Sequence, residues 1–391
     1  MSQPASAETT GRYLVLLENN SSAAGVRELN RVAGIQVAST ADSVAEQLAS
    51  QDGVIFHELG IALVEANADQ LPSLTRAIDE PGPVLAVEAE RVVHAITSTT
   101  TNGTVAAVDE SLFTWGLQAV GANLSTATGA GVRVAVLDTG FTVAHADFVG
   151  RTVTTSSFID GETVDDVHGH GTHCIGSSCG PRKPASGGPG YGVAYEAEIF
   201  AGKVLSNKGS GSDGGILAGI EWAISNGCAV VSMSLGAAVQ PNTPYSRIFE
   251  QAADRALAKG TLIVAAAGNE SDRPGRINAV GHPANCPSIL SVGAVDVNRA
   301  IAFFSCGTMD TIGAVDVVAP GVDVYSSWNK APGTKRLQGT SMATPHVAGV
   351  AALIAQKYGS RGYELWARLA QTARRLPLPS TDVGAGLVQA P

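Results

Sequence analysis

The chain has 391 residues, of which 45% are hydrophobic and 15% charged, with 45 glycines and a formal net charge of −10. This length and composition predict a soluble globular protein of two or three units with a large α/β core. No run reaches the roughly 18 consecutive apolar residues of a transmembrane helix, so a membrane is not expected as a partner. Residues 1–96 carry 13 acidic and 5 basic side chains, and this acidic excess argues against nucleic acid as a partner.

The first ten residues are small and polar, and we expect residues 1–10 to be a disordered N-terminus. No basic segment is followed by an apolar one, so no signal peptide is visible. This pattern favours the cytoplasm, with secretion as the alternative if a leader is missing from the chain. The five cysteines are an odd number and are expected to be free thiols, although a pair between Cys286 and Cys306 is left open.

Residues 11–96 have the pattern of a small α+β unit. Apolar runs and helical periodicity predict a strand, a helix, two strands, a second helix and a last strand, over residues 11–17, 22–33, 53–66, 68–78 and 83–89. This is the element order of a ferredoxin-like, or split βαβ, unit. The Thr, Ser, Gly and Ala-rich segment 97–114 that follows is predicted to be a linker.

Residues 115–391 form the second unit, in which strands alternate with helices. Apolar runs predict strands at 132–137, 199–205, 230–235, 261–266 and 289–295, with helices such as 214–226 and 244–259 between them. Repeated βαβ units predict a mostly parallel sheet with helices on both faces, which is a three-layer α/β domain.

Four polar residues in this unit stand at strand ends or helix starts. Asp138 ends one buried strand, Asn269 follows another, His170 lies in a glycine-rich turn that enters a helix, and Ser341 lies at the start of an Ala and Val-rich helix. Open α/β sheets build their sites at the carboxyl ends of the strands. Backbone N–H groups at a helix start lack partners and face outward. We therefore expect these four side chains to converge, although a lone serine at a helix start is more often only a cap.

The motifs around these residues occur in a characteristic order. They are Asp-Thr-Gly at 138–140, His-Gly-Thr-His at 170–173, Ala-Ala-Gly-Asn at 266–269 and Gly-Thr-Ser-Met-Ala-Thr-Pro-His at 339–346. With these motifs the chain resembles the subtilisin family of serine endopeptidases. The resemblance implies a subtilisin-like fold and the hydrolysis of peptide bonds through an acyl-enzyme, with no cofactor required for the chemistry.

The resemblance also implies a role for each matching residue. Ser341 would be the nucleophile, His170 its general base, Asp138 the residue that orients the base, and Asn269 a donor to the oxyanion. Two segments would pair with an extended substrate backbone, one with Gly209, Ser210 and Gly211 and the other with Ser234, Leu235 and Gly236. Gly281 would form a wall of the primary specificity pocket and leave room for a large apolar side chain, with Glu270 at the rim of the pocket. Ala266 and Gly268 are the other residues expected to bind substrate.

Residues 11–96 resemble the inhibitory propeptide of subtilisin-type proteases, with residues 87–96 as the tail that lies in the substrate cleft. The resemblance implies a zymogen that cuts itself between Ile96 and Thr97, with the mature N-terminus inside 97–115. We expect a monomer that acts on peptide or protein substrates and is inhibited by its own propeptide. A permanent accessory domain is the alternative for residues 11–96.

The sequence offers three candidate metal sites. Asp147 matches one ligand of a structural calcium site in the family, but the loop 181–191 that would complete the site holds no Asp, Glu or Asn. The acidic loop of Asp160, Glu162, Asp165 and Asp166 is an alternative calcium site, although a solvated loop is the simpler interpretation. His168, His170 and His173 could bind zinc, but their spacing is not that of a zinc protease, and His173 is expected to be buried and structural.

Two other functions are compatible with the motifs. One is a specialised protease that cuts or ligates a single peptide precursor inside a cell. The other is a subtilase-like binding protein without catalytic activity, which would lack a member of the triad, and none is missing here.

Overall fold

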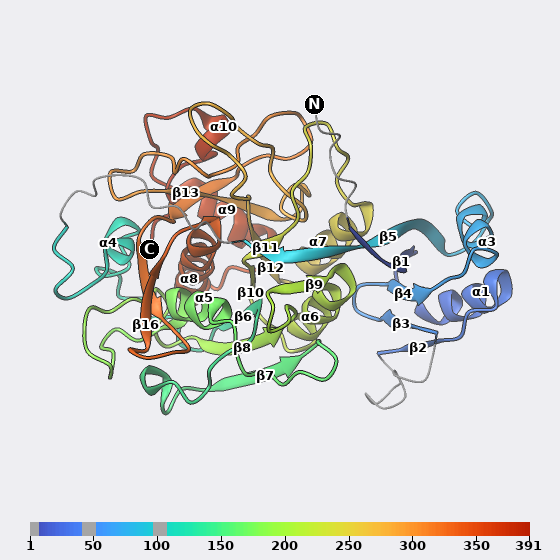
Figure 1. Ribbon diagram of the computed structural model, residues 1–391, viewed down its shortest axis with the longest axis horizontal. Helices are drawn as coiled ribbons and strands as arrows, with labels where there is room; N and C mark the ends of the chain where they lie inside the picture. The colour runs from blue at the N-terminus through green and yellow to red at the C-terminus, as the bar shows by residue number, and fades with distance from the viewer. Residues whose placement is uncertain (1–7, 41–51, 97–107) are drawn as a thin grey trace.

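The computed structural model describes residues 8–40, 52–96 and 108–391. Figure 1 shows a small N-terminal unit, residues 8–96, beside the larger unit that follows it, with a long strand reaching from the first into the second. None of the helices in the described ranges is long and apolar enough to cross a membrane. The expectations for residues 1–7 and for Thr97 and the adjoining linker to residue 107 lie outside the described residues.

The N-terminal unit contains every element that the sequence predicts for it. Its elements are β1 (Thr9–Leu17), α1 (Ser22–Ala33), β2 (Val37–Ser39), β3 (Gly53–Phe56), β4 (Ile61–Glu65), α3 (Gln70–Arg76) and β5 (Val84–Ala95). The strand order is β5-β1-β4-β3-β2, antiparallel except for the short β2, which the sequence analysis missed. β1 begins inside the stretch expected to be disordered, because Thr9 pairs with Arg91 of β5.

The sheet of this unit is covered on both faces. Side chains alternate along β1, so that Val15 and Leu17 pack with Leu29 of α1 and Leu74 of α3. Their neighbours of opposite orientation, Leu14 and Leu16, belong instead to the core cluster of the larger unit. On that side β1 contacts α7 (Arg247–Ala258), while β3 and β5 contact α6 (Asp213–Ser225). The N-terminal unit therefore has a core of its own and also contributes side chains to the core of the larger unit.

The larger unit is built on a seven-stranded parallel sheet, which confirms the predicted α/β fold. The strand order is β14-β13-β12-β10-β6-β8-β7, and every neighbouring pair is parallel. In chain order these strands are β6 (Arg133–Asp138), β7 (Val153–Ser157), β8 (Glu198–Lys203), β10 (Val230–Met233), β12 (Leu262–Ala266), β13 (Leu290–Val295) and β14 (Val317–Pro320). Every residue of the central strands β10, β12 and β13 is buried, as expected where helices cover a parallel sheet.

Two pairs of helices hold this sheet. α5 (His170–Cys179) and α8 (Thr340–Tyr358) pack against each other and against the sheet, whereas α6 and α7 pack against it and also reach the N-terminal unit. The remaining elements are short or peripheral: α4 (Trp115–Ala119), a 3₁₀ turn (Ala146–Phe148), β9 (Ser210–Ser212), β11 (Leu235–Gly236), the hairpin β15 (Val324–Ser327) and β16 (Thr334–Leu337), α9 (Gly362–Thr372) and α10 (Ser380–Val383).

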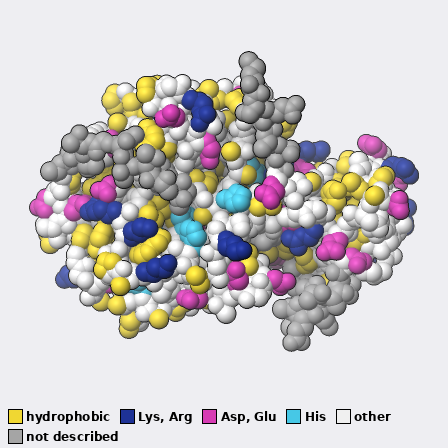
Figure 2. All heavy atoms as spheres, in the orientation of Figure 1, with side chains coloured by type: hydrophobic (Ala, Val, Ile, Leu, Met, Phe, Trp, Pro, Cys, Tyr) yellow, Lys and Arg dark blue, Asp and Glu magenta, His cyan; other side chains and the backbone are white. Residues whose placement is uncertain are grey.

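The predicted strand 230–235 is two elements rather than one. β10 leaves the parallel sheet at Met233, and Leu235–Gly236 form β11, which pairs with β5 of the N-terminal unit. The apolar run hides this break because Leu235 is as buried as the residues of β10. On the face seen in Figure 2, the Lys and Arg side chains of the described residues are interspersed with Asp and Glu ones.

Candidate active site

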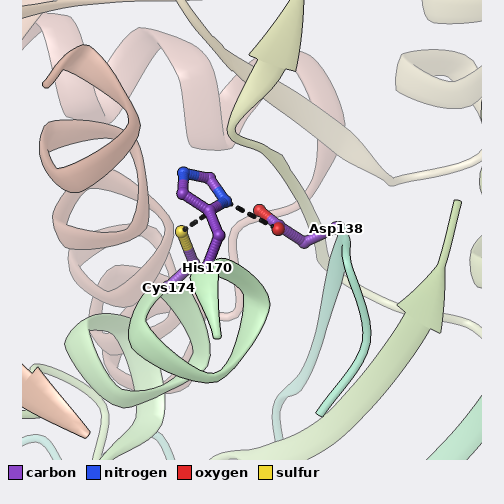
Figure 3. Close-up of side chains that lie close together, drawn as sticks. All are labelled: Asp138, His170 and Cys174. Carbon is purple, nitrogen blue, oxygen red and sulfur yellow. Dashed lines mark hydrogen bonds and ion pairs between the residues drawn. The ribbon is translucent and has the colours of Figure 1, made fainter. Parts of the chain in front are cut away.

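The carboxyl edge of the parallel sheet brings Asp138 and His170 together (Figure 3). Asp138 is the last residue of β6 and His170 the first of α5, and His170 Nδ1 lies 2.7 Å from Asp138 Oδ1. Both side chains are almost fully buried. The backbone N–H of Thr139 donates to the same carboxylate oxygen at 2.7 Å, which fixes its orientation. The acid therefore holds the imidazole by one nitrogen and leaves the other free.

The free nitrogen of His170 is the one available for proton transfer. Nε2 is buried and has no hydrogen-bond partner in the described part of the chain. Burial by itself lowers the pKa of His170, but the Asp138 carboxylate and the Cys174 thiol outweigh it and raise that pKa well above its ordinary value of 6.5. A base must be neutral to accept a proton. In this closed arrangement His170 therefore gains its capacity as a base only as the pH rises through the raised pKa.

Ser341 lies in the first turn of α8, close to the end of the N-terminal unit. Its hydroxyl donates to the backbone carbonyl oxygens of Ile96 and of Ser234, the latter at 3.2 Å. Its own carbonyl oxygen accepts from Ser234 Oγ at 2.8 Å and from the Cys174 thiol at 3.5 Å. The structure thus places a peptide carbonyl of the same chain against the hydroxyl of this serine.

The side chain of Asn269 is held by its oxygen, which leaves its amide nitrogen free. Oδ1 accepts from both the backbone N–H and the hydroxyl of Thr340, each at 2.9 Å. Nδ2 is buried without a partner in the described ranges. A Cβ at Gly339 would come within 2.8 Å of that nitrogen and 3.4 Å of the Ile96 carbonyl oxygen. The amide donor and the carbonyl therefore flank the same glycine, where negative charge on the carbonyl oxygen would be stabilised.

The two segments assigned to substrate pairing form strands with β5. β11 pairs antiparallel with β5 on one side through Leu235 and Ala95, and β9 pairs on the other through Gly211 and Val93. The N–H of Ala95 donates to Gly209 O at 2.9 Å, and the N–H of Ile96 donates to Ser234 O at 3.3 Å. A strand inserted between two short edges gains its affinity from such main-chain bonds.

Gly236 of the strand-pairing segment lies against the Ile96 side chain, whereas Gly281 and Ala266 lie near the end of β12, where the Gly281 N–H donates to Ala267 O at 2.9 Å. Ile96 Cδ1 would be 3.2 Å from a Cβ at Gly236, so that glycine makes room for the isoleucine. A Cβ at Gly281 would lie 2.9 Å from Ala237 O, and Ala266 is buried at the end of β12.

A contact that the sequence analysis missed lies behind Gly268. The Cys306 thiol donates to Glu270 Oε2 at 3.2 Å, and a Cβ at Gly268 would collide with both groups. Burial, together with the Glu270 charge, raises the pKa of Cys306 to about 12, so the thiol stays protonated and remains a donor. Because Cys306 is 36 residues further along the chain, no local pattern around Glu270 indicates this partner.

Comparison with known proteins shows the family of the chain. The Subtilase family model of peptidases matches residues 129–386. The chain belongs to the subtilase family. It is 42% identical to Subtilisin DY from Bacillus licheniformis over 263 residues, 66% of this chain and 89% of that protein. It is 41% identical to Subtilisin Savinase from Lederbergia lenta over 285 residues, 71% of this chain and 96% of that protein. It is also 41% identical to Alkaline elastase YaB from Bacillus sp. (strain YaB), over 71% of this chain and 68% of that protein.

As a member of this family the chain is a subtilisin-type serine endopeptidase, and the Asp138 and His170 pair is consistent with the acid and base of its triad. The subtilase reaction needs no cofactor. Asp138, His170 and Cys174 also offer three possible metal ligand atoms within 4.8 Å of one another. Since Asp138 and His170 Nδ1 already share a hydrogen bond, we assign this cluster to the acid and base pair of the subtilase.

The other two histidines of the motif are not brought together with His170 as ligands. His173 is buried, and its Nε2 lies 3.1 Å from both Val324 O and Lys335 O, so this nitrogen carries the hydrogen. Burial lowers the pKa of His173 to about 3, which keeps it neutral. The ring of His168 lies 6.2 Å from that of His170 in an edge arrangement. His173 therefore anchors α5 to the β15 and β16 hairpin.

The surroundings of Asp147 do not fit a calcium ion. Its Oδ1 accepts from the Ser186 backbone N–H at 2.7 Å, and its Oδ2 accepts from Ser186 Oγ at 2.8 Å and from the Tyr191 hydroxyl at 2.7 Å. Burial and the bond to Asp147 raise the pKa of Tyr191, which keeps the hydroxyl a donor. Hydrogen-bond donors of the protein thus occupy both oxygens of the Asp147 carboxylate, which a calcium ion would need as ligands. The acidic loop does not supply a cage either, because Glu162 pairs with Lys203 at 3.3 Å.

Replacing Tyr191 by Phe should lower the free energy of unfolding by about 1–3 kcal/mol, because the buried Asp147 carboxylate loses a hydrogen bond. Urea unfolding of the inactive Ser341→Ala chain would measure it, with and without a calcium chelator. Tyr325→Phe, on the ring that packs against Tyr191 at 6.0 Å, is the matched control. A chelator-sensitive stability that Asp147→Asn abolishes would contradict the assignment.

All five cysteines are free and buried, so the pairing left open between Cys286 and Cys306 does not occur. The Cys286 thiol donates to Ser246 O at 3.7 Å, while Cys306 binds Glu270. Burial raises the pKa of each of the five thiols.

Proposed function

We propose that the chain is a self-processing zymogen in which residues 8–96 belong to an inhibitory propeptide that is cut after Ile96. The observation that supports this most directly is the hydrogen bond from the Ser341 hydroxyl to the Ile96 carbonyl oxygen. The main-chain pairing of β5 with β9 and β11 holds that carbonyl as part of a bound strand. The bond that would break lies between Ile96 and Thr97.

Two glutamates of β5 support the idea of a docked inhibitor. Glu88 accepts from Ser246 Oγ at 2.7 Å and from the Arg247 backbone N–H at 2.8 Å, at the start of α7. Glu90 is fully buried and accepts from the Gly214 backbone N–H at 2.9 Å, at the start of α6. Carboxylates are stabilised at helix N-termini. The same strand that enters the site therefore satisfies the unpaired N–H groups of two catalytic-unit helices.

Two buried side chains of the larger unit form hydrogen bonds with backbone groups of the N-terminal unit. Glu221 of α6 accepts from the backbone N–H groups of Glu58 and Leu59 at 2.9 and 3.1 Å. Arg255 of α7 donates to the carbonyl oxygen of Leu17 at 2.9 Å and to that of Leu59. None of these contacts depends on the bond after Ile96. Cleavage alone would leave them intact, and the cut segment would remain bound as an inhibitor.

The proposed reaction gives each residue of the candidate active site the role that the resemblance to the family implies. The Ser341 hydroxyl attacks the Ile96 carbonyl carbon while His170 Nε2 takes its proton, and Asp138 stabilises the charged imidazole. Asn269 Nδ2 donates to the oxyanion of the tetrahedral intermediate. The intermediate collapses as His170 returns the proton to the departing amine of residue 97, which leaves an acyl-enzyme at Ser341. A water molecule, activated by His170 as the general base, then attacks this ester.

An intact-mass time course of the purified wild-type chain tests the proposal. We expect a 96-residue N-terminal fragment to appear at a first-order rate that does not depend on protein concentration. Ile96→Asp should slow this cut strongly, because it puts a charge against Gly236 in a site that leaves Ile96 only 9% exposed. Leu112→Asp is the control, since Leu112 is 72% exposed in the segment that precedes α4.

Other results would redirect the proposal. A cut between residues 97 and 115 that Leu112→Asp blocks and Ile96→Asp does not would move the processing site. An uncut chain that still reacts at Ser341 with a fluorophosphonate probe would make residues 8–96 a permanent domain. Broad digestion of unrelated unfolded proteins by the processed enzyme would argue against the alternative of a protease dedicated to one peptide precursor.

A further inference from the structure

Asp166 is a buried carboxylate, 2% exposed, in the loop that leads into α5. Its two oxygens accept four hydrogen bonds. Oδ1 accepts from Thr139 Oγ1 at 2.8 Å and from the Gly169 backbone N–H at 2.7 Å. Oδ2 accepts from the backbone N–H and the hydroxyl of Thr172, at 2.8 and 2.7 Å. All four donors lie in the two segments that carry Asp138 and His170.

On one side, Asp166 completes the start of the helix that carries the base. α5 begins at His170, and the residue before it is Gly169, which has φ of 101° and no side chain to cap the helix. Asp166 accepts from the N–H of Thr172 in the first turn, and Thr139 Oγ1 accepts from the N–H of Gly171 at 2.9 Å. Two N–H groups of this turn, those of Gly171 and Thr172, are thus satisfied from outside the helix.

On the other side, Asp166 reaches the strand that carries the acid. Thr139 follows Asp138 directly, and its hydroxyl bridges Asp166 and Gly171. The backbone N–H of Thr139 donates to Asp138 Oδ1 at 2.7 Å, which is the same oxygen that lies 2.7 Å from His170 Nδ1. One carboxylate therefore joins the end of β6 to the start of α5 at the point where acid and base meet.

We infer that Asp166 is a positioning residue of the catalytic centre, which sets the distance and orientation between Asp138 and His170 through Thr139 and the first turn of α5. None of its four side-chain hydrogen bonds goes to the bound Ile96 segment or to Ser341. The inference rests on the proposed roles of Asp138 and His170 in the reaction.

Asp166→Asn is the first variant, because it keeps the shape of the side chain. Its amide nitrogen cannot accept a hydrogen bond, yet it would face N–H and O–H donors. We expect kcat on a peptide substrate to fall about 100-fold, since a misplacement of about 1 Å costs this much. KM should stay nearly constant, because β9 and β11 bind the substrate strand without contacting Asp166. Active-site titration with a fluorophosphonate corrects the rates for the amount of folded enzyme. Asp147→Asn is the matched control, a buried aspartate with three donors.

A second pair of variants keeps the test decisive if Asp166→Asn fails to fold. Thr139→Ser retains the bridging hydroxyl and should keep nearly wild-type kcat, whereas Thr139→Val removes it and should lose kcat as Asp166→Asn does. The inference is overturned if Asp166→Asn loses no more kcat than Asp147→Asn, if kcat and KM change together, or if Thr139→Ser is as slow as Thr139→Val. A wild-type chain that neither processes itself nor cleaves peptides would instead overturn the proposed function.

Discussion

The Ser341→Ala chain should remain at its full 391 residues under conditions in which the wild type separates into two fragments. The substitution removes the only hydroxyl that donates to the Ile96 carbonyl in the described ranges, so no acyl-enzyme forms. In subtilisin itself, loss of the corresponding serine reduces kcat by about 2 × 10⁶, which sets the scale of the expected effect. Intact-mass spectrometry over several days should therefore show the variant uncut.

The control for this experiment separates lost chemistry from lost structure. Ser341→Ala keeps the backbone carbonyl that accepts from Ser234 Oγ and Cys174, so the start of α8 should stay in place. Its thermal midpoint should therefore match that of unprocessed wild type. If the purified variant, free of other proteases, is cut at the wild-type rate, Ser341 is not the nucleophile.

Asn269→Ala should reduce kcat by about 10² to 10³, the loss measured for the corresponding oxyanion donor of subtilisin, with a smaller change in KM. The reason is that Asn269 Nδ2 has no hydrogen-bond partner among residues 8–40, 52–96 and 108–391, so it is available when negative charge develops on the substrate carbonyl oxygen. The measurement is steady-state hydrolysis of a chromogenic peptide that ends in isoleucine, the residue that the site holds in this structure.

Asn269→Asp distinguishes the donor from the scaffold. An aspartate keeps an oxygen for the two donors of Thr340 but lacks the N–H group and adds a negative charge. We expect it to be at least as slow as Asn269→Ala. If it has the wild-type kcat, Asn269 acts only by holding Thr340 and not by stabilising the oxyanion.

The sequence predicts the parallel sheet and the location of its polar residues well, because these features are local. Continuous apolar runs define β6, β10 and β12, and the residue that ends each run lies at the carboxyl edge of the sheet by the geometry of βαβ units. The family motifs then name the polar residues at that edge.

What the sequence does not predict depends on partners far along the chain. The break between β10 and β11 exists because Leu235 pairs with Ala95, 140 residues earlier. Asp147 was compared with a calcium ligand by its spacing from Asp138, yet its partners prove to be Ser186 and Tyr191. Neutral donors of this kind, unlike the carboxylates of a metal site, leave no pattern that can be recognised before the loop is folded.

Asp166 shows the same limit at closer range. It is part of an acidic loop in which Asp160, Glu162 and Asp165 are its neighbours, and composition alone cannot distinguish a buried member from solvated ones. Its burial follows from the contact of this loop with Thr139 at the end of β6.

The separation of Ser341 and Ile96 along the chain would make the proposed cut a late event. The hydroxyl of Ser341 and the carbonyl of Ile96 are 245 positions apart, and the sheet that joins them includes strands up to β14. Synthesis delivers residues 1–96 before it delivers Ser341. On the proposed function, a chain whose synthesis stops before Ser341 would therefore hold the bond after Ile96 but lack the nucleophile, and it would not cut itself. The appearance of the 96-residue fragment would thus report that translation and assembly of the whole sheet are complete.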